Sequence, residues 1–132
     1  MKMDINKQTP EIYCAISIIF EQSVNVDEIA NSLRKMGISE INVCRPTCES
    51  LVSLDIAIVK NERFWHLDSA LTKMFSKIVR IEELKKLASK YKGSFCIDIA
   101  FYQHGTYPSL EFIGDNMKKI RFLEADISID AY

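Results

Sequence analysis

Residues 11–20 read EIYCAISIIF, a run of β-branched and aromatic side chains that follows Pro10 and predicts a β-strand. Residues 51–60 read LVSLDIAIVK and alternate with period two, which predicts a second strand. The same criteria predict a third strand over residues 95–103 and a last one over residues 126–132. Because successive side chains of a strand point to opposite sides, each strand is expected to bury one face and leave the other free.

Amphipathic helices are predicted between these strands. Asn25 is a capping residue with Glu28 three positions later, and the apolar residues that follow at helical spacing end at Gly37. Apolar residues three or four positions apart over residues 71–91 predict either one long helix or two helices joined near Val79.

The remaining segments are predicted to be shorter. Residues 38–50 are expected to be irregular, with a short edge strand near residues 41–44. A turn at residues 104–108 and a strand at residues 109–113 would close a hairpin, and Asp115 would cap a short last helix.

This order of elements predicts an α+β fold. Each amphipathic helix must bury its apolar stripe, so we expect a two-layer sandwich, a mostly antiparallel sheet with helices packed on one face. The 132 residues contain only four glycines and three prolines, which are scattered and form no linker. Residues 1–10 are polar and end at Pro10, so they are expected to be a flexible lead-in, and residues 11–132 are expected to be a single α+β domain.

Period-two alternation sorts the strand side chains into two faces. The face expected to meet the helices comprises Ile12, Cys14, Ile16, Ile18, Phe20, Val52, Leu54, Ile56, Ile58, Phe95, Ile97, Ile99, Phe101, Ile127 and Ile129. The face expected to be free comprises Tyr13, Ala15, Ser17, Ser53, Asp55, Ala57, Cys96, Asp98, Ala100, Tyr102, Asp126, Ser128, Asp130 and Tyr132. The second set contains aspartates and tyrosines but no lysine or arginine.

This free face is the candidate binding surface. Protein interfaces are enriched in tyrosine, and a concentration of one charge sign attracts a partner of the opposite sign. The predicted partner-binding residues are Asp55, Asp98, Tyr102, Asp126, Asp130 and Tyr132. The alternative is an ordinary solvated face, because antiparallel sheets commonly leave one face in water.

Three short segments carry a family resemblance. Trp65 to Ser69, the run from Tyr107 to Leu110, and the closing residues 127–132, ISIDAY, together resemble an uncharacterised bacterial family, domain of unknown function 4279. Pro46 and Thr47 stand farther beyond Gly37 than that family's pattern places them. The resemblance supports the fold and implies no established activity. By analogy, similar small single-domain proteins sometimes neutralise secreted bacterial toxins.

Charge and composition restrict the functional class and the location. Seventeen basic and eighteen acidic residues give a formal charge of −1, which provides no global basic field for direct nucleic-acid binding. The first eight residues lack the apolar core of a signal peptide, and no apolar run is long enough to span a membrane. We therefore expect a cytoplasmic protein with reduced cysteines.

No complete catalytic or metal-binding set is recognisable. Cys44 and Cys48 lack the second ligand pair that structural zinc requires, so no metal and no cofactor are predicted. His66 is expected to pack or cap a helix, His104 to lie in an exposed turn, and Trp65 to anchor the core.

The sequence therefore predicts a noncatalytic protein-binding module. The specific expectation is a bacterial immunity protein that neutralises a basic toxin domain by covering its site with the acidic, tyrosine-bearing face. The alternatives are a small enzyme and a homo-oligomeric structural module of unknown activity.

Overall fold

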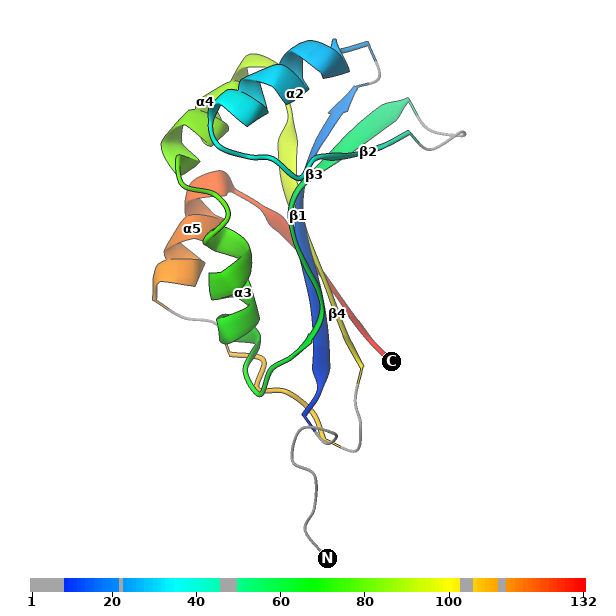
Figure 1. Ribbon diagram of the computed structural model, residues 1–132, viewed down its shortest axis with the longest axis vertical. Helices are drawn as coiled ribbons and strands as arrows, with labels where there is room; N and C mark the ends of the chain where they lie inside the picture. Colours follow the sequence, from blue (N-terminus) through cyan, green and yellow to red (C-terminus); the bar gives the residue numbers. More distant parts are fainter. Residues whose placement is uncertain (1–8, 22, 46–49, 103–105, 112–113) are drawn as a thin grey trace, which may run out of the picture.

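The computed structural model describes residues 9–21, 23–45, 50–102, 106–111 and 114–132. Figure 1 shows the helices on one side of a single sheet, so the predicted two-layer α+β fold is confirmed. In the described part of the chain the elements are β1 (Glu11–Glu21), α2 (Val26–Lys35), β2 (Asn42–Cys44), β3 (Leu51–Arg63), α3 (Leu67–Phe75), α4 (Ile81–Lys90), β4 (Ser94–Tyr102), α5 (Asp115–Leu123) and β5 (Asp126–Ala131).

The sheet has the strand order β2-β3-β1-β4-β5. β1 is central and runs antiparallel to both β3 and β4, and β2 is antiparallel to β3. Among the described strands of this sheet, only β5 pairs in parallel, alongside β4. A parallel pair needs a crossover connection, and α5 lies in that connection.

The predicted hairpin after β4 is wrong. Ser109 does not pair with β4 but forms an isolated parallel bridge with His66 at the start of α3. Its N–H donates to the carbonyl of Trp65, and its own carbonyl accepts the N–H of Leu67, each at 2.8 Å. β5 takes the position beside β4 that the hairpin strand would have occupied. Residues 103–105 of the expected turn lie outside the described residues.

The first helix confirms its capping signal. The side-chain oxygen of Asn25 accepts the backbone N–H of Glu28 at 3.1 Å, and Gly37 ends the segment with a φ of 89°. Ile29 and Leu33 are buried against the sheet. The cap and the apolar stripe therefore place α2 as the sequence predicts.

The long amphipathic region forms two helices, α3 and α4, which is one of the two predicted alternatives. The break includes Val79, whose side chain is 81% exposed. The predicted cap of α5 is wrong, because Gly114, with a φ of 66°, holds the N-cap position and Asp115 is the first helical residue.

A β-bulge in β3 changes which side chains face the helices. Ile16 pairs with Ala57 but Ser17 pairs with Asp55, so Ile56 is an additional residue in β3. Beyond the bulge, Ala57 is fully buried on the helix side, whereas Ile58 lies opposite Ala15 on the other face. The prediction that Ile58 meets the helices and Ala57 the free face is wrong, because a one-residue insertion reverses the alternation.

The core lies between β1, β3, β4 and the helices, and Phe20, Phe75 and Leu71 are among its fully buried side chains. Thr9 and Pro10 are also buried, and the carbonyl of Pro10 accepts the N–H of Phe64 at 3.0 Å. None of the helices in the described segments is long and apolar enough to cross a membrane.

Candidate functional site

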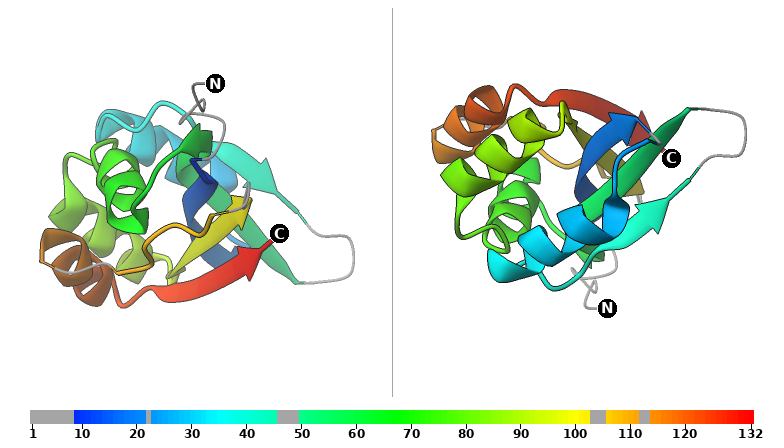
Figure 2. Two further views of the ribbon diagram at one scale, coloured as in Figure 1. Left: turned by 90° about the horizontal axis from the view of Figure 1, so that it is seen from below. Right: turned by 90° about the horizontal axis from the view of Figure 1, so that it is seen from above.

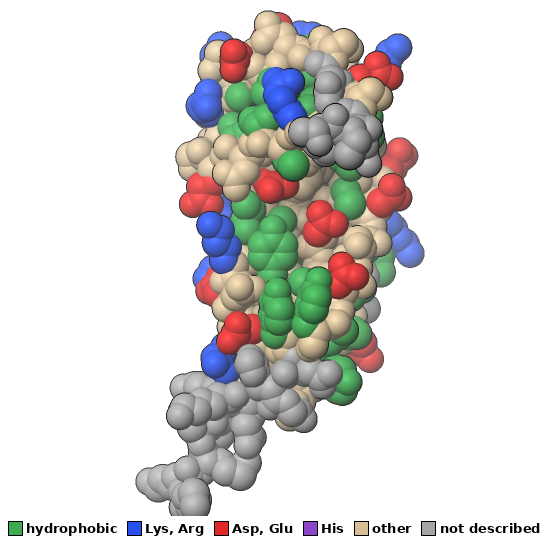
Figure 3. Space-filling model, turned by 90° about the vertical axis from the view of Figure 1, so that its right-hand side faces the viewer, with side chains coloured by type: hydrophobic (Ala, Val, Ile, Leu, Met, Phe, Trp, Pro, Cys, Tyr) green, Lys and Arg blue, Asp and Glu red, His purple; other side chains and the backbone are tan. Residues whose placement is uncertain are grey.

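The side of the sheet without helices, called here the open face, gathers the predicted binding residues. Figure 3 shows acidic side chains around a patch of hydrophobic side chains on this face, with basic side chains only toward its margins. In the described part of the chain the middle of this face comprises Tyr13, Ala15 and Ser17 of β1, Ser53, Asp55 and Ile58 of β3, Cys96, Asp98, Ala100 and Tyr102 of β4, Asp126, Ser128 and Asp130 of β5, and Tyr132, and the ion pair of Glu11 with Arg63 lies at its margin beside Tyr102.

The central strand β1 carries small side chains on the open face, and the larger side chains of the neighbouring strands cover them. Ala15 and Ser17 are 1% and 3% exposed, because Asp55 from β3 and Asp98 from β4 stand on either side of them. The hydroxyl of Ser17 donates to Oδ1 of Asp55 at 2.5 Å. This bond fixes the Asp55 carboxylate, whereas Asp98 on the other side is exposed.

The aspartates set the electrostatics of the face. Burial, followed by the charges of Asp55 and Asp98, raises the pKa of Tyr13 above its ordinary value. Burial also raises the pKa of the Cys96 thiol, and the charge of Asp98, the contact between Cys96 Sγ and Asp98 Oδ1 at 3.7 Å, and the charge of Asp126 add to it. Negative charge therefore acts on both groups in the middle of the open face.

Among the residues that the structure describes, none of these aspartates forms an ion pair. Within the described residues, the ion pairs join Arg63 to Glu11, Lys73 to Glu62, Lys77 to Glu40 and Arg80 to Glu83, and the open-face aspartates take part in none of them. Asp98, Asp126 and Asp130 are exposed. Their negative charge is therefore available to a partner.

Tyr102 and Tyr132 form an exposed aromatic platform at one end of the face. Their rings stack with centroids 5.1 Å apart and an interplanar angle of 17°. The N–H of Tyr132 donates to the carbonyl of Phe101 at 3.0 Å, which holds the end of the chain beside β4. The side chains of Tyr102 and Tyr132 remain 37% and 63% exposed. Such a pair offers a large contact area, and its side chains lose little conformational entropy on binding because each has few rotatable bonds.

All six predicted binding residues lie on the open face, five of them on β3, β4 and β5 and Tyr132 directly after β5. Alternation also predicts Tyr13 and Cys96 on this face, between the aspartates, although neither is among the six predicted binding residues. Alternation misses Ile58, because the bulge that turns this side chain to the open face leaves no mark in an apolar run.

Trp65, His66 and Cys14 are further residues that the sequence analysis considered and the structure describes. His66 holds the N-cap position of α3 without a side-chain hydrogen bond to the helix, and Trp65 is 44% exposed, so its predicted core position is wrong. Burial, with a contribution from Glu62, raises the pKa of Cys14 to about 12, which keeps this thiol protonated. Five prominent surface hollows in the described segments are lined by neither His66 nor a cysteine.

The metal prediction concerns residues that are only partly described. The described residues contain no group of three or more histidine, cysteine or acidic side chains that could hold a metal ion. Cys44 is exposed and unpaired, whereas Cys48 and His104 lie outside the described residues.

Comparisons with protein-family models, with curated proteins and with solved structures found no match. The resemblance to domain of unknown function 4279 stays a prediction.

Proposed function

We propose that this protein is a noncatalytic binding module whose open face covers a basic surface of another protein. The observation that supports this proposal is the gathering of Asp55, Asp98, Asp126 and Asp130 on one uncovered face without a basic partner among the described residues. Carboxylates arranged in this way increase the association rate with a cationic surface and disfavour anionic partners. The stacked tyrosines supply the apolar contact that charge alone does not provide.

The specific proposal is neutralisation of a bacterial toxin by occlusion. A nuclease toxin must present a basic groove to the phosphates of its substrate. The open face offers carboxylates and flat aromatic rings, which can occupy such a groove and compete with phosphates and bases for it. The family resemblance and its analogy with immunity proteins agree with this role in the cytoplasm of the producing cell.

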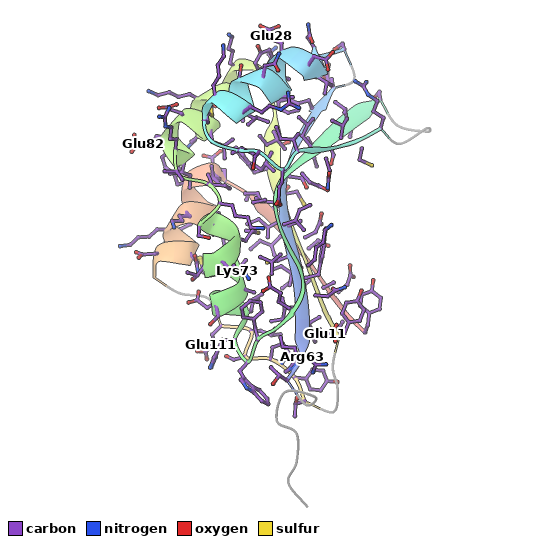
Figure 4. All side chains as sticks on the ribbon, in the orientation of Figure 1. Glu11, Glu28, Arg63, Lys73, Glu82 and Glu111 are labelled. Carbon is purple, nitrogen blue, oxygen red and sulfur yellow. The ribbon has the colours of Figure 1, made fainter. Side chains whose placement is uncertain are left out.

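The product of the gene adjacent to the gene for this protein is the partner to test. Both proteins are produced together in a host that the partner alone would kill, and growth and affinity are measured. The test variant is Asp98→Lys/Asp130→Lys. The matched control is Glu82→Lys/Glu111→Lys, which changes the formal charge equally on the helix side of the molecule (Figure 4).

The open-face variant should lose affinity and the control should not. A carboxylate about 5 Å from a cation in water contributes about 0.8 kcal/mol, which salt at physiological strength reduces to about 0.4 kcal/mol. Replacing attraction by equal repulsion at two sites then weakens binding about 20-fold. Equal loss in both variants, or no loss in the open-face variant, would refute the proposal.

A further inference from the structure

Among the described strands, β5 has an outer edge that pairs with no other strand, at the margin of the sheet. β5 is the last strand in the order and pairs only with β4 (Figure 2). All six of its residues are exposed. No other strand of the described residues borders this edge.

The backbone direction shows which groups this edge offers. The N–H of Tyr132 donates to Phe101 in β4, and in a strand alternate residues direct their N–H and C=O groups to the same side. Asp130, two residues earlier, therefore also points its backbone toward β4. Ile127, Ile129 and Ala131 point theirs outward, where they can pair with a further strand.

The side chains of β5 give this edge two different faces. Asp126 and Asp130 lie on the open face, in register with Cys96 and Ala100 of β4. Ile127 and Ile129 lie on the helix side, in register with Ile97 and Ile99, but they are 36% and 44% exposed. The helix layer therefore leaves apolar surface uncovered at this margin.

The opposite margin of the sheet ends in β2, which has only three residues, whereas β5 has six. β2 covers only Ser53 to Asp55 of β3, but beyond it Lys77 donates to the carbonyl of Ile58 at 2.5 Å and two irregularities interrupt the β3 ladder. Lysines and bulges are the usual means by which proteins block edge pairing. β5 contains no lysine, proline or bulge.

We propose that β5 recruits its partner by strand addition, pairing with a segment that alternates basic and apolar residues. This inference rests on the proposed function, because it assigns the basic residues of the same partner to Asp126 and Asp130. Lysine or arginine opposite these aspartates would lie on the open face, and apolar side chains between them would cover Ile127 and Ile129.

A second copy of this chain fits the edge less well. Residues 126–130 read DISID, which is palindromic about Ser128. Antiparallel self-pairing of all five residues sets Asp126 opposite Asp130 of the other copy, and in-register parallel pairing sets each aspartate opposite itself. Like charges directly opposite each other destabilise a strand pair. Charge complementarity therefore favours a basic strand.

The test uses a synthetic peptide, acetyl-Gly-Lys-Val-Thr-Val-Lys-Gly-amide, titrated into the isotope-labelled full chain and followed by NMR. Its central five residues are palindromic, so they match β5 in either direction. One control peptide carries N-methyl groups on these five residues, which keeps the charge but removes the donors. A second control replaces both lysines with glutamate.

The expected result is a set of amide shifts centred on Ile127, Ile129 and Ala131, with slowed hydrogen exchange at the amides that point outward. The N-methylated and glutamate peptides should bind at least about tenfold more weakly. In the protein, Ile129→Pro removes one backbone N–H that points outward, so the affinity for the lysine peptide should fall to a similar degree. Ile129→Lys keeps the backbone N–H and serves as a second variant. It should also lower the affinity for the lysine peptide, because it replaces an apolar contact with a positive charge.

Several results would overturn the inference. Equal affinity of the lysine and N-methylated peptides, with amide shifts at Asp55 and Asp98 only, would refute strand addition. The proposed function would then still be supported. Absence of any shift at β5 would also overturn it. A dimer in sedimentation that Ile129→Pro dissociates would make a second copy the occupant. Conversely, edge binding of the peptide with no effect of Asp98→Lys/Asp130→Lys on the partner would support the edge and refute the proposed function.

Discussion

Replacing Asp98 with asparagine should stabilise the folded protein, because this carboxylate is repelled by its neighbours. Asp98 lies beside Ser128 of β5, so Asp126 and Asp130 occupy the two diagonal positions. Strand spacing and rise place these charges about 8 Å from Asp98. In water each repulsion amounts to about 0.5 kcal/mol, or about 1 kcal/mol for the pair. A salt concentration of about 0.15 M reduces this sum to about 0.4 kcal/mol.

Thermal and urea unfolding of Asp98→Asn at low and high salt measure this effect. At low salt the free energy of unfolding should rise by about 1 kcal/mol and the melting temperature by roughly 4 °C, and about 1 M salt should abolish the gain. Glu111→Gln, an exposed change on the helix side, is the control and should stay within about 0.5 kcal/mol of the wild type. A destabilised Asp98→Asn variant, or a gain that salt does not alter, would refute the repulsion on the open face.

Three further predictions concern single residues. The Cys96 thiol should react with iodoacetamide more slowly than a free thiol at pH 8, because its pKa is raised, and Asp98→Asn should accelerate the reaction; an unchanged rate would contradict the assigned cause. Gly93→Ala should destabilise the fold by about 1–3 kcal/mol in urea unfolding, because its Cβ would lie 2.4 Å from a ring carbon of Phe20; a neutral result would show that the ring can move aside. Tyr132→Ala should reduce stability by no more than about 1 kcal/mol but weaken partner binding at least about tenfold, whereas equal small losses in both assays would exclude it from the interface.

The parts of the fold that sequence reasoning predicted correctly carry strong local signals. The Asn25 cap and the Gly37 terminus bound α2, and period-two alternation in β1 and β4 separates their two faces correctly. Asp55 precedes the bulge in β3, so alternation also places it correctly on the open face. The candidate site was therefore predictable because its residues lie in regular strand segments.

The errors arise where several structures share one local pattern. The run from Ile56 to Val59 is entirely apolar, so an inserted residue leaves no trace in its polarity, and the alternation reverses without a signal. The turn-like residues after β4 are compatible with a hairpin, but β4 has only two edges, and β1 and β5 occupy both. Competition between distant segments for one edge is a tertiary effect that local propensity does not include.

How far the helices cover the sheet could not be predicted from the sequence either. Ile127 and Ile129 alternate as buried residues should, and their register with β4 is as expected. Their exposure depends on how far the helix layer extends over the margin, which is set by the packing of whole helices. The mismatch between an apolar pattern and an exposed position is what distinguishes this edge.

The most direct test of the open face follows aromatic ring resonances while the partner is added to the full chain. Tyr102 and Tyr132 report on the open face, and Phe122, which is 39% exposed beside Lys85, reports on the helix layer. The account predicts that the tyrosine resonances shift or broaden at the stoichiometry of binding while those of Phe122 stay in place. Movement of Phe122 with unchanged tyrosines would place the partner on the helices and contradict the account.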